Sequence, residues 1–338
     1  MVKFVVGIFV SVCALAIAAP VAHAEGQAHG RKPVHKKAVK RHAAPVRQKP
    51  VAQRVSYTPS TPPAPPVMTA GDLAGLGATR DPLALKSNAA FVIDQNNAHV
   101  LFEKNAEVAL PIASLTKLMT AMVVLDAKQD MNEVLEVTAD DIDRERNSSS
   151  RLRVGAKLSR TNMLHIALMS SENRAASALG RSYPGGLPAF VAAMNAKAKS
   201  LGMTQTHYAD STGLSSQNVA SAHDLARLVM AAYHQPLIRD YSTDAHYTVQ
   251  PGGHPLQYVN SNRLVMNSHW DIGLQKTGYI TEAGRCLVMQ AKIDGRPVVM
   301  VFLDSKGKDS RLADAGRVRK WIETNRPQLV TQIAPRQG

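Results

Sequence analysis

Strand-forming segments lie at both ends of the foldable part of this chain, and helix-forming segments lie between them. The strand-like segments, rich in apolar and β-branched residues, are 89–94, 99–102, 247–249, 273–280, 286–293 and 297–303. Apolar residues recur three and four apart in 114–127, 164–169, 187–201, 224–234 and 309–324, which predicts helices. This order predicts an α/β chain of the α+β kind, with an antiparallel sheet flanked by helices and an inserted all-helical lobe.

The first 24 residues have the layout of a secretory signal peptide rather than of a domain. Lys3 is followed by an apolar run over 4–19, and Ala22-His23-Ala24 is a small-x-small cleavage site. The run is shorter than the ~20 residues that a membrane-spanning helix needs, so cleavage is favoured over a retained anchor. We expect cleavage near Ala24 and a periplasmic mature protein.

Residues 25–75 form a basic, proline-rich stretch that we predict to be a disordered tether. Residues 25–70 contain nine Lys or Arg, eight prolines and a single acid, Glu25, and they lack the large apolar residues that a core requires. Two interpretations stay open: attachment to an anionic wall or membrane surface, or a solvated spacer. Nucleic acid is a poor partner for an exported protein. A catalytic domain over 76–326 and a tail over 327–338 complete the predicted organisation.

Cysteine and histidine give no sign of a disulfide or a cofactor. Cys286 is the one cysteine left after cleavage, so no intrachain disulfide forms, and its apolar neighbours predict a buried structural residue. The twelve histidines have no compact metal-binding spacing, and the chain has no GxGxxG. The sequence indicates neither a metal nor an organic cofactor.

Three short motifs follow one another along the chain. They are Ser114-Leu115-Thr116-Lys117, Ser171-Glu172-Asn173 and Lys276-Thr277-Gly278, a set typical of penicillin-binding proteins and class A β-lactamases. A serine hydroxyl needs an adjacent base to act as a nucleophile. Residues i and i+3 share one face of a helix, so Lys117 reaches Ser114, and apolar neighbours favour its neutral amine.

The other two motifs predict the remaining parts of such a site. Ser171 is suited to relaying a proton to the leaving nitrogen, and Asn173 to orienting the substrate or the lysine. Lys276 and Thr277, at a strand edge, are suited to holding a terminal carboxylate of the substrate. Gly278 is predicted to leave room for the substrate beside the strand.

Two further matches to these motifs, and one histidine, are interpreted as structural. Ser305 and Lys308 form a second S-x-x-K in a polar turn, where no helix aligns them. Ser216-Gln217-Asn218 is a second S-x-N in a glycine-containing loop, where a capping or turn role is natural. His165, inside a predicted apolar helix, is expected to be a core residue.

Across roughly residues 80–325 the chain resembles the low-molecular-mass penicillin-binding proteins, the D-alanyl-D-alanine peptidases of the S11 type. The resemblance rests on 111–120, 169–176, 210–214 and 276–279. It implies a β-lactamase/transpeptidase-like fold and a Ser114 acyl-enzyme with Lys117 as its base. It also implies an oxyanion hole from the backbone N–H groups of Ser114 and Tyr279, peptidoglycan stems and cross-links as substrate, and β-lactams as covalent inhibitors.

The short segment after the last predicted helix resembles the D-alanyl-D-alanine endopeptidase branch, which cuts cross-links. The alternative is a D,D-carboxypeptidase that removes terminal D-alanine. More remote alternatives are a β-lactamase and a wall-binding protein without activity. No E-x-x-L-N-like segment stands between Ser171 and Lys276, so we expect slow hydrolysis of a β-lactam acyl-enzyme.

Overall fold

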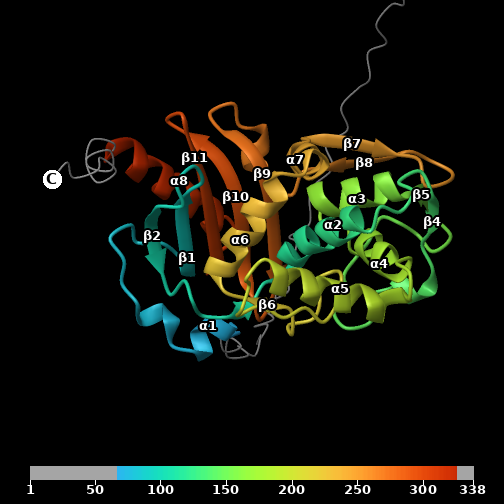
Figure 1. Ribbon diagram of the computed structural model, residues 1–338, viewed down its shortest axis with the longest axis horizontal. Helices are drawn as coiled ribbons and strands as arrows, with labels where there is room; N and C mark the ends of the chain where they lie inside the picture. The colour runs from blue at the N-terminus through green and yellow to red at the C-terminus, as the bar shows by residue number, and fades with distance from the viewer. Residues whose placement is uncertain (1–66, 326–338) are drawn as a thin grey trace, which may run out of the picture. The chain divides into compact units, whose positions relative to one another are not determined.

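A five-stranded antiparallel sheet forms one half of the folded chain in the computed structural model, which describes residues 67–325 (Figure 1). The strand order is β2-β1-β11-β10-β9. The strands are β1 Ser87–Asp94, β2 Val100–Lys104, β9 Asp271–Ile280, β10 Gly284–Ile293 and β11 Arg296–Ser305. The first long strand therefore pairs with the last one, and β9 is left at an edge, which confirms the predicted sheet.

Both faces of the sheet are covered by helices, which explains why its strands are apolar on both sides. All eight residues of β1 are buried. Helix α8 (Ser310–Thr324) packs on one face of β10 and β11, and α6 (Ala222–Tyr233) packs on the opposite face of the same strands. Each helix shares a separate hydrophobic cluster with the strand residues on its own face. Ala315, Val318 and Ile322 of α8 are buried, as their spacing predicted.

The helical lobe is built around α2, whose sequence is apolar on nearly every side. Its members are α2 Thr116–Asp126, α3 Arg160–Met169, α4 Asn173–Arg181, α5 Gly186–Ser200 and α7 Pro236–Thr243. Helix α2 packs against α3, α4, α5 and α6, so it is the central helix of the lobe. The sequence patterns did not predict α4, which is rich in small residues, or α7, which begins at Pro236 where proline suits a first helical turn.

Short elements connect these layers. They are α1 Ala70–Leu73, β3 Leu110–Pro111 with β6 Val219–Ala220, β4 Val134–Glu136 with β5 Lys157–Ser159, and β7 His246–Val249 with β8 Leu256–Val259. The sequence pair Asp294-Gly295 predicts a tight hairpin, and it forms the turn between β10 and β11, with positive φ at both residues as such a hairpin requires.

The predicted signal peptide, nearly all of the predicted tether and the tail lie outside the described residues. Within 67–325, no helix combines the length and the apolar character needed to cross a membrane.

Candidate active site

Ser114 lies in a 3-10 turn, Ala113–Leu115, which leads directly into α2. The predicted helix over 114–127 therefore begins two residues later, at Thr116, and Ser114 makes no capping bond to it. Ala113 has φ of 49°, a strained conformation for a residue with a side chain. The Thr116 hydroxyl donates to the Ala113 carbonyl at 2.8 Å and holds this turn. The half-buried Ser114 hydroxyl is thereby left for a side-chain partner.

Lys117 is that partner, and it has only 1% of its surface exposed. Its Nζ atom donates to Ser114 Oγ at 2.9 Å, to Asn173 Oδ1 at 2.7 Å and to the Thr212 carbonyl at 2.6 Å. All three acceptors are neutral, and within residues 67–325 no carboxylate forms an ion pair with this amine. The structure thus brings together the serine, the lysine and the asparagine that the motifs singled out.

Burial lowers the pKa of Lys117 to about 7, against the attraction of Asp210 and Glu172, whose charges act to raise it. A lysine amine with this pKa is neutral in a large fraction of molecules at neutral pH. It can therefore accept the Ser114 proton, as a general base must.

The start of α4 fixes the orientation of Asn173. Its side-chain nitrogen donates to Ser148 Oγ at 2.9 Å, which turns its oxygen toward Lys117. Glu172 is the N-cap of α4 and accepts from the Arg174 N–H at 3.2 Å and from Ser150 Oγ at 2.6 Å. The middle residue of the S-x-N motif is therefore a structural anchor.

Ser171 stands in the turn between α3 and α4, with φ of 66°. A left-handed conformation at a residue with a side chain is typical of functional sites. Its half-buried hydroxyl makes no hydrogen bond within the described part of the chain. The structure thus places Ser171 next to Asn173 but does not link its hydroxyl to Ser114 or Lys117.

The loop 210–215 contributes a backbone group that the motifs did not indicate. Asp210 accepts hydrogen bonds from the N–H groups of Gly213 at 2.6 Å and Ser215 at 2.9 Å, and so organises the loop. Gly213 has φ of 82°, and a Cβ there would lie 2.0 Å from the Ala113 carbonyl oxygen. Only glycine allows this loop to approach the serine turn so closely, which brings the Thr212 carbonyl to Lys117.

The edge strand β9 carries the third motif beside the serine turn. Lys276 is fully buried, and its Nζ donates to the Thr277 carbonyl at 2.8 Å. Burial lowers its pKa, helped by the positive charges of Lys117 and Arg311. The Thr277 hydroxyl shares a hydrogen bond of 2.7 Å with Ser261. Both side chains thus have partners inside the protein, and their contact with a substrate carboxylate stays a prediction.

Gly278 lies where the edge strand meets the serine turn. A Cβ at this position would lie 2.8 Å from the Ile112 carbonyl oxygen and 3.1 Å from the Ser114 nitrogen. The glycine therefore lets β9 touch the serine turn, and its role in making room for a substrate stays a prediction. Arg311, a residue of α8 that no motif indicated, donates to the Gly278 carbonyl at 3.2 Å.

Tyr279, the next residue, is 54% exposed, and the Arg285 guanidinium lies 4.5 Å from the centre of its ring. Its backbone stands next to Gly278 and therefore near the Ser114 nitrogen. Tyr279 is thus an exposed aromatic side chain near the end of β9.

The two additional motif matches and His165 have structural contacts. Ser305 Oγ donates to Ser310 Oγ at 2.7 Å. Asn218 accepts from the N–H groups of Ala209 and Asp210 and so holds loop 210–215. His165 is 3% exposed and stacks against two rings, those of Tyr241 and Tyr247.

Cys286 is fully buried, as predicted, and burial raises the pKa of its thiol to about 12, so it is not a thiolate nucleophile. No cluster of three or more His, Cys, Asp or Glu side chains suited to a metal ion occurs among residues 67–325.

Comparisons with known proteins agree with this geometry. The model of the Peptidase_S11 family, D-alanyl-D-alanine carboxypeptidase, matches residues 77–307. The D-alanyl-D-alanine endopeptidases of Pseudomonas aeruginosa and Escherichia coli are 49% and 44% identical to the chain, each over 74% of this chain and 81% of the relative. Penicillin-binding protein D2 from Listeria monocytogenes, solved in its cefotaxime-bound form, aligns with a TM-score of 0.64 at 28% identity, over 71% of this chain and 98% of that one.

Proposed function

The chain belongs to the S11 family of serine D,D-peptidases, and we propose that it cuts D-alanyl peptide bonds of peptidoglycan through an acyl-enzyme on Ser114. One observation carries this mechanism. A buried lysine with neutral partners lies 2.9 Å from a serine hydroxyl in a strained turn. Lys117 is therefore a base whose amine has no carboxylate in direct contact with it among residues 67–325.

The reaction follows from this pair of residues. Neutral Lys117 takes the proton of Ser114 while Oγ forms a bond to the D-alanyl carbonyl carbon. The carbon–nitrogen bond then breaks, and the proton passes to the leaving amine, with Ser171 as the proposed relay. In the second step, water adds to the acyl carbon, its oxygen replaces Ser114 Oγ, and Ser114 regains a proton.

Strand β9 is suited to align the substrate. As an edge strand it offers unpaired backbone groups beside Ser114, and an extended peptide adds to such an edge as a further strand. In this arrangement, the N–H groups of Ser114 and Tyr279 hold the oxyanion. Lys276 and Thr277 take the terminal carboxylate once it replaces their internal partners.

We propose that the bond is the cross-link between two peptide stems. The relatives that share 44–49% identity are endopeptidases, whereas a carboxypeptidase of Bacillus subtilis shares 30%. Carboxypeptidase activity is the second candidate, because the family model bears that description.

β-Lactams are proposed to label Ser114 in a long-lived adduct. Glu172, the carboxylate in the middle of the S-x-N motif, caps α4 and accepts the Ser150 hydroxyl, so it is not free to activate water. A penicillin-binding relative has been solved with cefotaxime bound.

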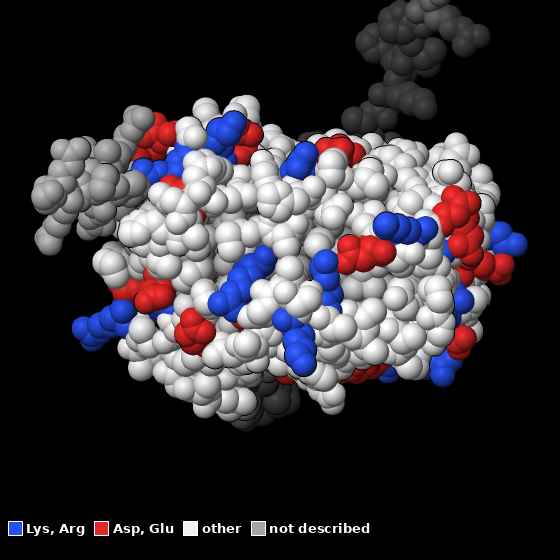
Figure 2. Space-filling view, in the orientation of Figure 1, with Lys and Arg blue, Asp and Glu red and all other residues white. Residues whose placement is uncertain are grey.

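The mature protein is proposed to be periplasmic, with residues 25–70 attaching it to an anionic wall or membrane surface. The charge of this stretch supports the attachment. On the face of the folded part drawn in Figure 2, basic and acidic side chains are interspersed, so that face has no field of a single sign. Sedimentation with purified cell-wall sacculi at rising salt tests this. Loss of binding on deleting 25–66 supports attachment, and salt-independent binding contradicts it.

The catalytic proposal is tested by intact-protein mass spectrometry with penicillin, followed by digestion of cross-linked muropeptide dimers and D-Ala-D-Ala pentapeptides. A stable adduct on Ser114 and conversion of dimers to monomers are expected. Release of terminal D-alanine alone would make the protein a carboxypeptidase. Ser114→Ala should abolish the adduct, whereas the matched control Ser216→Ala, in the second S-x-N, should retain it.

A further inference from the structure

An arginine–glutamate pair joins a loop of the helical lobe to the turn that follows β9. Arg146 Nη1 lies 2.9 Å from Glu282 Oε2. Arg146 belongs to the loop that follows the short 3-10 helix Ala139–Asp141 in the helical lobe. Glu282 belongs to the turn between β9 and β10. The pair therefore connects the helical lobe to the end of β9.

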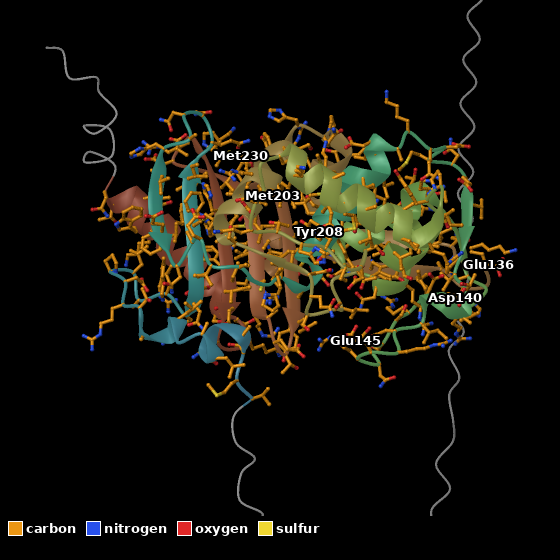
Figure 3. The ribbon with its side chains drawn as sticks, turned by 60° about the horizontal axis from the view of Figure 1, so that its bottom comes forward. Glu136, Asp140, Glu145, Met203, Tyr208 and Met230 are labelled. Atoms are coloured by element: carbon orange, nitrogen blue, oxygen red, sulfur yellow. The ribbon has the colours of Figure 1, made fainter. Side chains whose placement is uncertain are left out.

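The loop that carries Arg146 is held close to the site by the protein itself. Asp143 accepts from the N–H groups of Arg146 at 3.0 Å and Ser148 at 2.8 Å. Ser148 holds Asn173, and Arg146 Nε donates to the Leu214 carbonyl, one residue after the glycine that touches the serine turn. Figure 3 labels Glu145, the residue that precedes Arg146 in this loop.

Glu282 is an imperfect partner for this arginine. The side chain of Glu282 is 44% exposed, while that of Arg146 is 20% exposed. The paired oxygen, Oε2, is buried but has no hydrogen bond of good geometry within residues 67–325. Burial acts to raise the pKa of Glu282, yet contact with Arg146 brings it below the usual value. The charges attract one another, but Glu282 does not accept the two parallel hydrogen bonds that a guanidinium can donate to a well-placed carboxylate.

The direction of β9 places one part of the substrate at this pair. We take the terminal carboxylate of the substrate to lie at Lys276 and the scissile carbonyl at Ser114. The substrate residue that precedes the D-alanine with the scissile carbonyl then lies beyond Tyr279, toward the end of β9. Glu282 is three residues beyond Tyr279. A side-chain carboxylate on that substrate residue would thus come to the place that the Glu282 carboxylate occupies.

We propose that Arg146 is a specificity residue that binds a free carboxylate on the substrate residue preceding the D-alanine, and that Glu282 occupies this position until substrate arrives. The inference rests on the proposed D,D-peptidase function. Arg146 can make the exchange without moving, because its Nε stays on the Leu214 carbonyl while the carboxylate at Nη1 changes from that of Glu282 to that of the substrate. Glu145, 3.7 Å away, is the other acid in contact with it.

Two synthetic peptides test the proposal: acetyl-Ala-Glu-D-Ala-D-Ala and its Gln analogue. The readout is the concentration of each peptide that slows labelling of Ser114 by a fluorescent penicillin in the full mature chain, which requires no turnover. For the unaltered protein we expect the Glu peptide to protect at about 3- to 10-fold lower concentration.

The two members of the pair should respond in opposite directions. Arg146→Gln should remove the preference for the Glu peptide. Glu282→Gln should increase it, because the competing carboxylate is gone. If the pair were only a brace, both variants would weaken protection by both peptides alike, and that result would overturn the inference. The matched control is Arg319→Gln, from an Arg–Glu pair of 2.7 Å within α8, which should keep the original preference.

The outcomes separate this inference from the function on which it rests. If neither peptide protects Ser114 although penicillin labels it, the proposed D,D-peptidase function fails. If both peptides protect equally in the unaltered protein, the function stands and the role of Arg146 is wrong. Thermal unfolding of each variant shows whether the loop remains folded, and Glu282→Gln keeps the test decisive if Arg146→Gln does not fold.

Discussion

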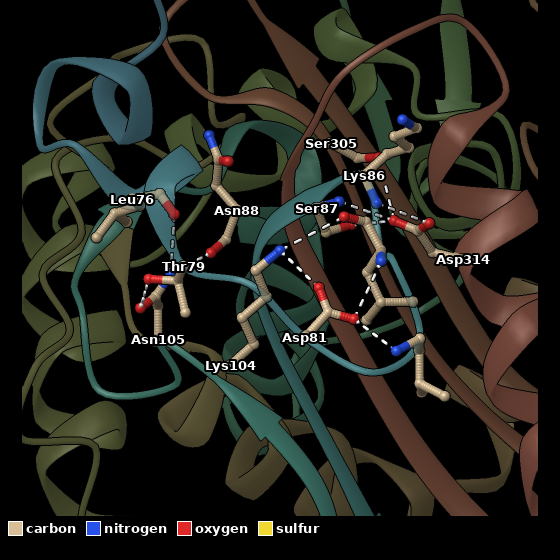
Figure 4. Close-up of polar contacts among 12 residues, drawn as sticks. Leu76, Thr79, Asp81, Lys86, Ser87, Asn88, Lys104, Asn105, Ser305 and Asp314 are labelled. Atoms are coloured by element: carbon tan, nitrogen blue, oxygen red, sulfur yellow. Dashed lines mark hydrogen bonds and ion pairs between the residues drawn. The ribbon is translucent and has the colours of Figure 1, made fainter.

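Two of the lysines buried within residues 67–325, Lys117 and Lys104, have opposite surroundings. Lys104 is 7% exposed, and its Nζ lies 2.9 Å from a carboxylate oxygen of Asp81, within the polar cluster of Figure 4. Lys117 is 1% exposed and has three neutral acceptors, one of them the Ser114 hydroxyl. The positive charge of Lys104 is compensated by the Asp81 carboxylate. Burial without such a partner instead favours the uncharged form of Lys117.

This difference shows how a fold assigns chemistry to a residue type. A buried ammonium is stable when a carboxylate pairs with it, and it then has no tendency to exchange a proton. Without that carboxylate, burial favours the amine and brings the pKa into the range of catalysis. The partner of a buried lysine therefore decides between a structural and a catalytic role.

The largest effect should follow removal of the catalytic amine. Lys117→Met is expected to slow acylation of Ser114 by penicillin about 10²- to 10⁴-fold, because no base remains beside the hydroxyl. Stability should change by no more than about 2 kcal/mol, since relief of the buried amine offsets the lost hydrogen bonds. Stopped-flow acylation and urea unfolding measure the two quantities, and acylation at the normal rate would exclude Lys117 as the base.

The same substitution at the other lysine should have the reverse result. Lys104→Met leaves Asp81 buried without its cation, so the free energy of unfolding should fall by about 3–5 kcal/mol. Acylation per folded molecule should stay normal. Urea unfolding and active-site titration check this; a large loss of acylation in folded Lys104→Met protein would contradict the division between the lysines.

The acid side of the Lys104 pair predicts a dependence of stability on pH. The pKa of Asp81 is lowered, because hydrogen bonds from Lys104 and from backbone N–H groups outweigh the opposing effect of burial. Its stabilisation is therefore present above the ordinary aspartate pKa of about 4 and is lost as the pH falls through the lowered value. Melting curves between about pH 5 and 2 should show a steeper loss in the unaltered protein than in Lys104→Met.

Asn173→Asp should make the catalytic lysine resemble the structural one. A carboxylate at 2.7 Å in place of the amide oxygen would favour the charged amine and raise the pKa of Lys117. Because the neutral amine is the proposed base, acylation in the unaltered protein should rise through a pKa of about 7. In the variant this rise should move up by about 1 to 2 pH units, with acylation at pH 7 about 5- to 50-fold slower. An unchanged profile would show that Asn173 does not set the charge of Lys117.

The fold could largely be predicted from the sequence because its signals are local. Alternating and β-branched residues defined β1, β10 and β11, and Asp294-Gly295 defined the hairpin between the last two. Helix α4 was missed because small residues such as Ala175 and Ala176 carry little apolar pattern, although they are fully buried in the lobe. Tertiary packing, rather than propensity, stabilises that helix.

The site could be predicted only where its spacing is local. Ser114 and Lys117 share a face three residues apart, so their contact followed from the sequence. Thr212 and Ser148 reach the site from loops, and their distance along the chain from Lys117 hides the contact. The turn-forming Asp210-Ser211-Thr212-Gly213 was the one local signal of this kind. For Gly278 the residue was found, but its close approach to Ile112 could not be predicted, because that contact depends on the folded arrangement.

The smallest effect tests the second S-x-x-K, which lies in the cluster of Lys104. Ser305 Oγ is 3.4 Å from Asp314, whose carboxylate also accepts the Ser87 hydroxyl at 2.6 Å (Figure 4). Ser305→Ala should therefore cost about 1 kcal/mol of stability, the value of one hydrogen bond, and leave acylation at Ser114 unchanged. If Ser305→Ala lost the penicillin adduct, the S-x-x-K spacing alone would be enough for acylation, without a helix and without neutral partners for the lysine. An intact adduct with a slightly lowered melting temperature would show that the surroundings of the lysine, and not the spacing of the letters, distinguish the two sites.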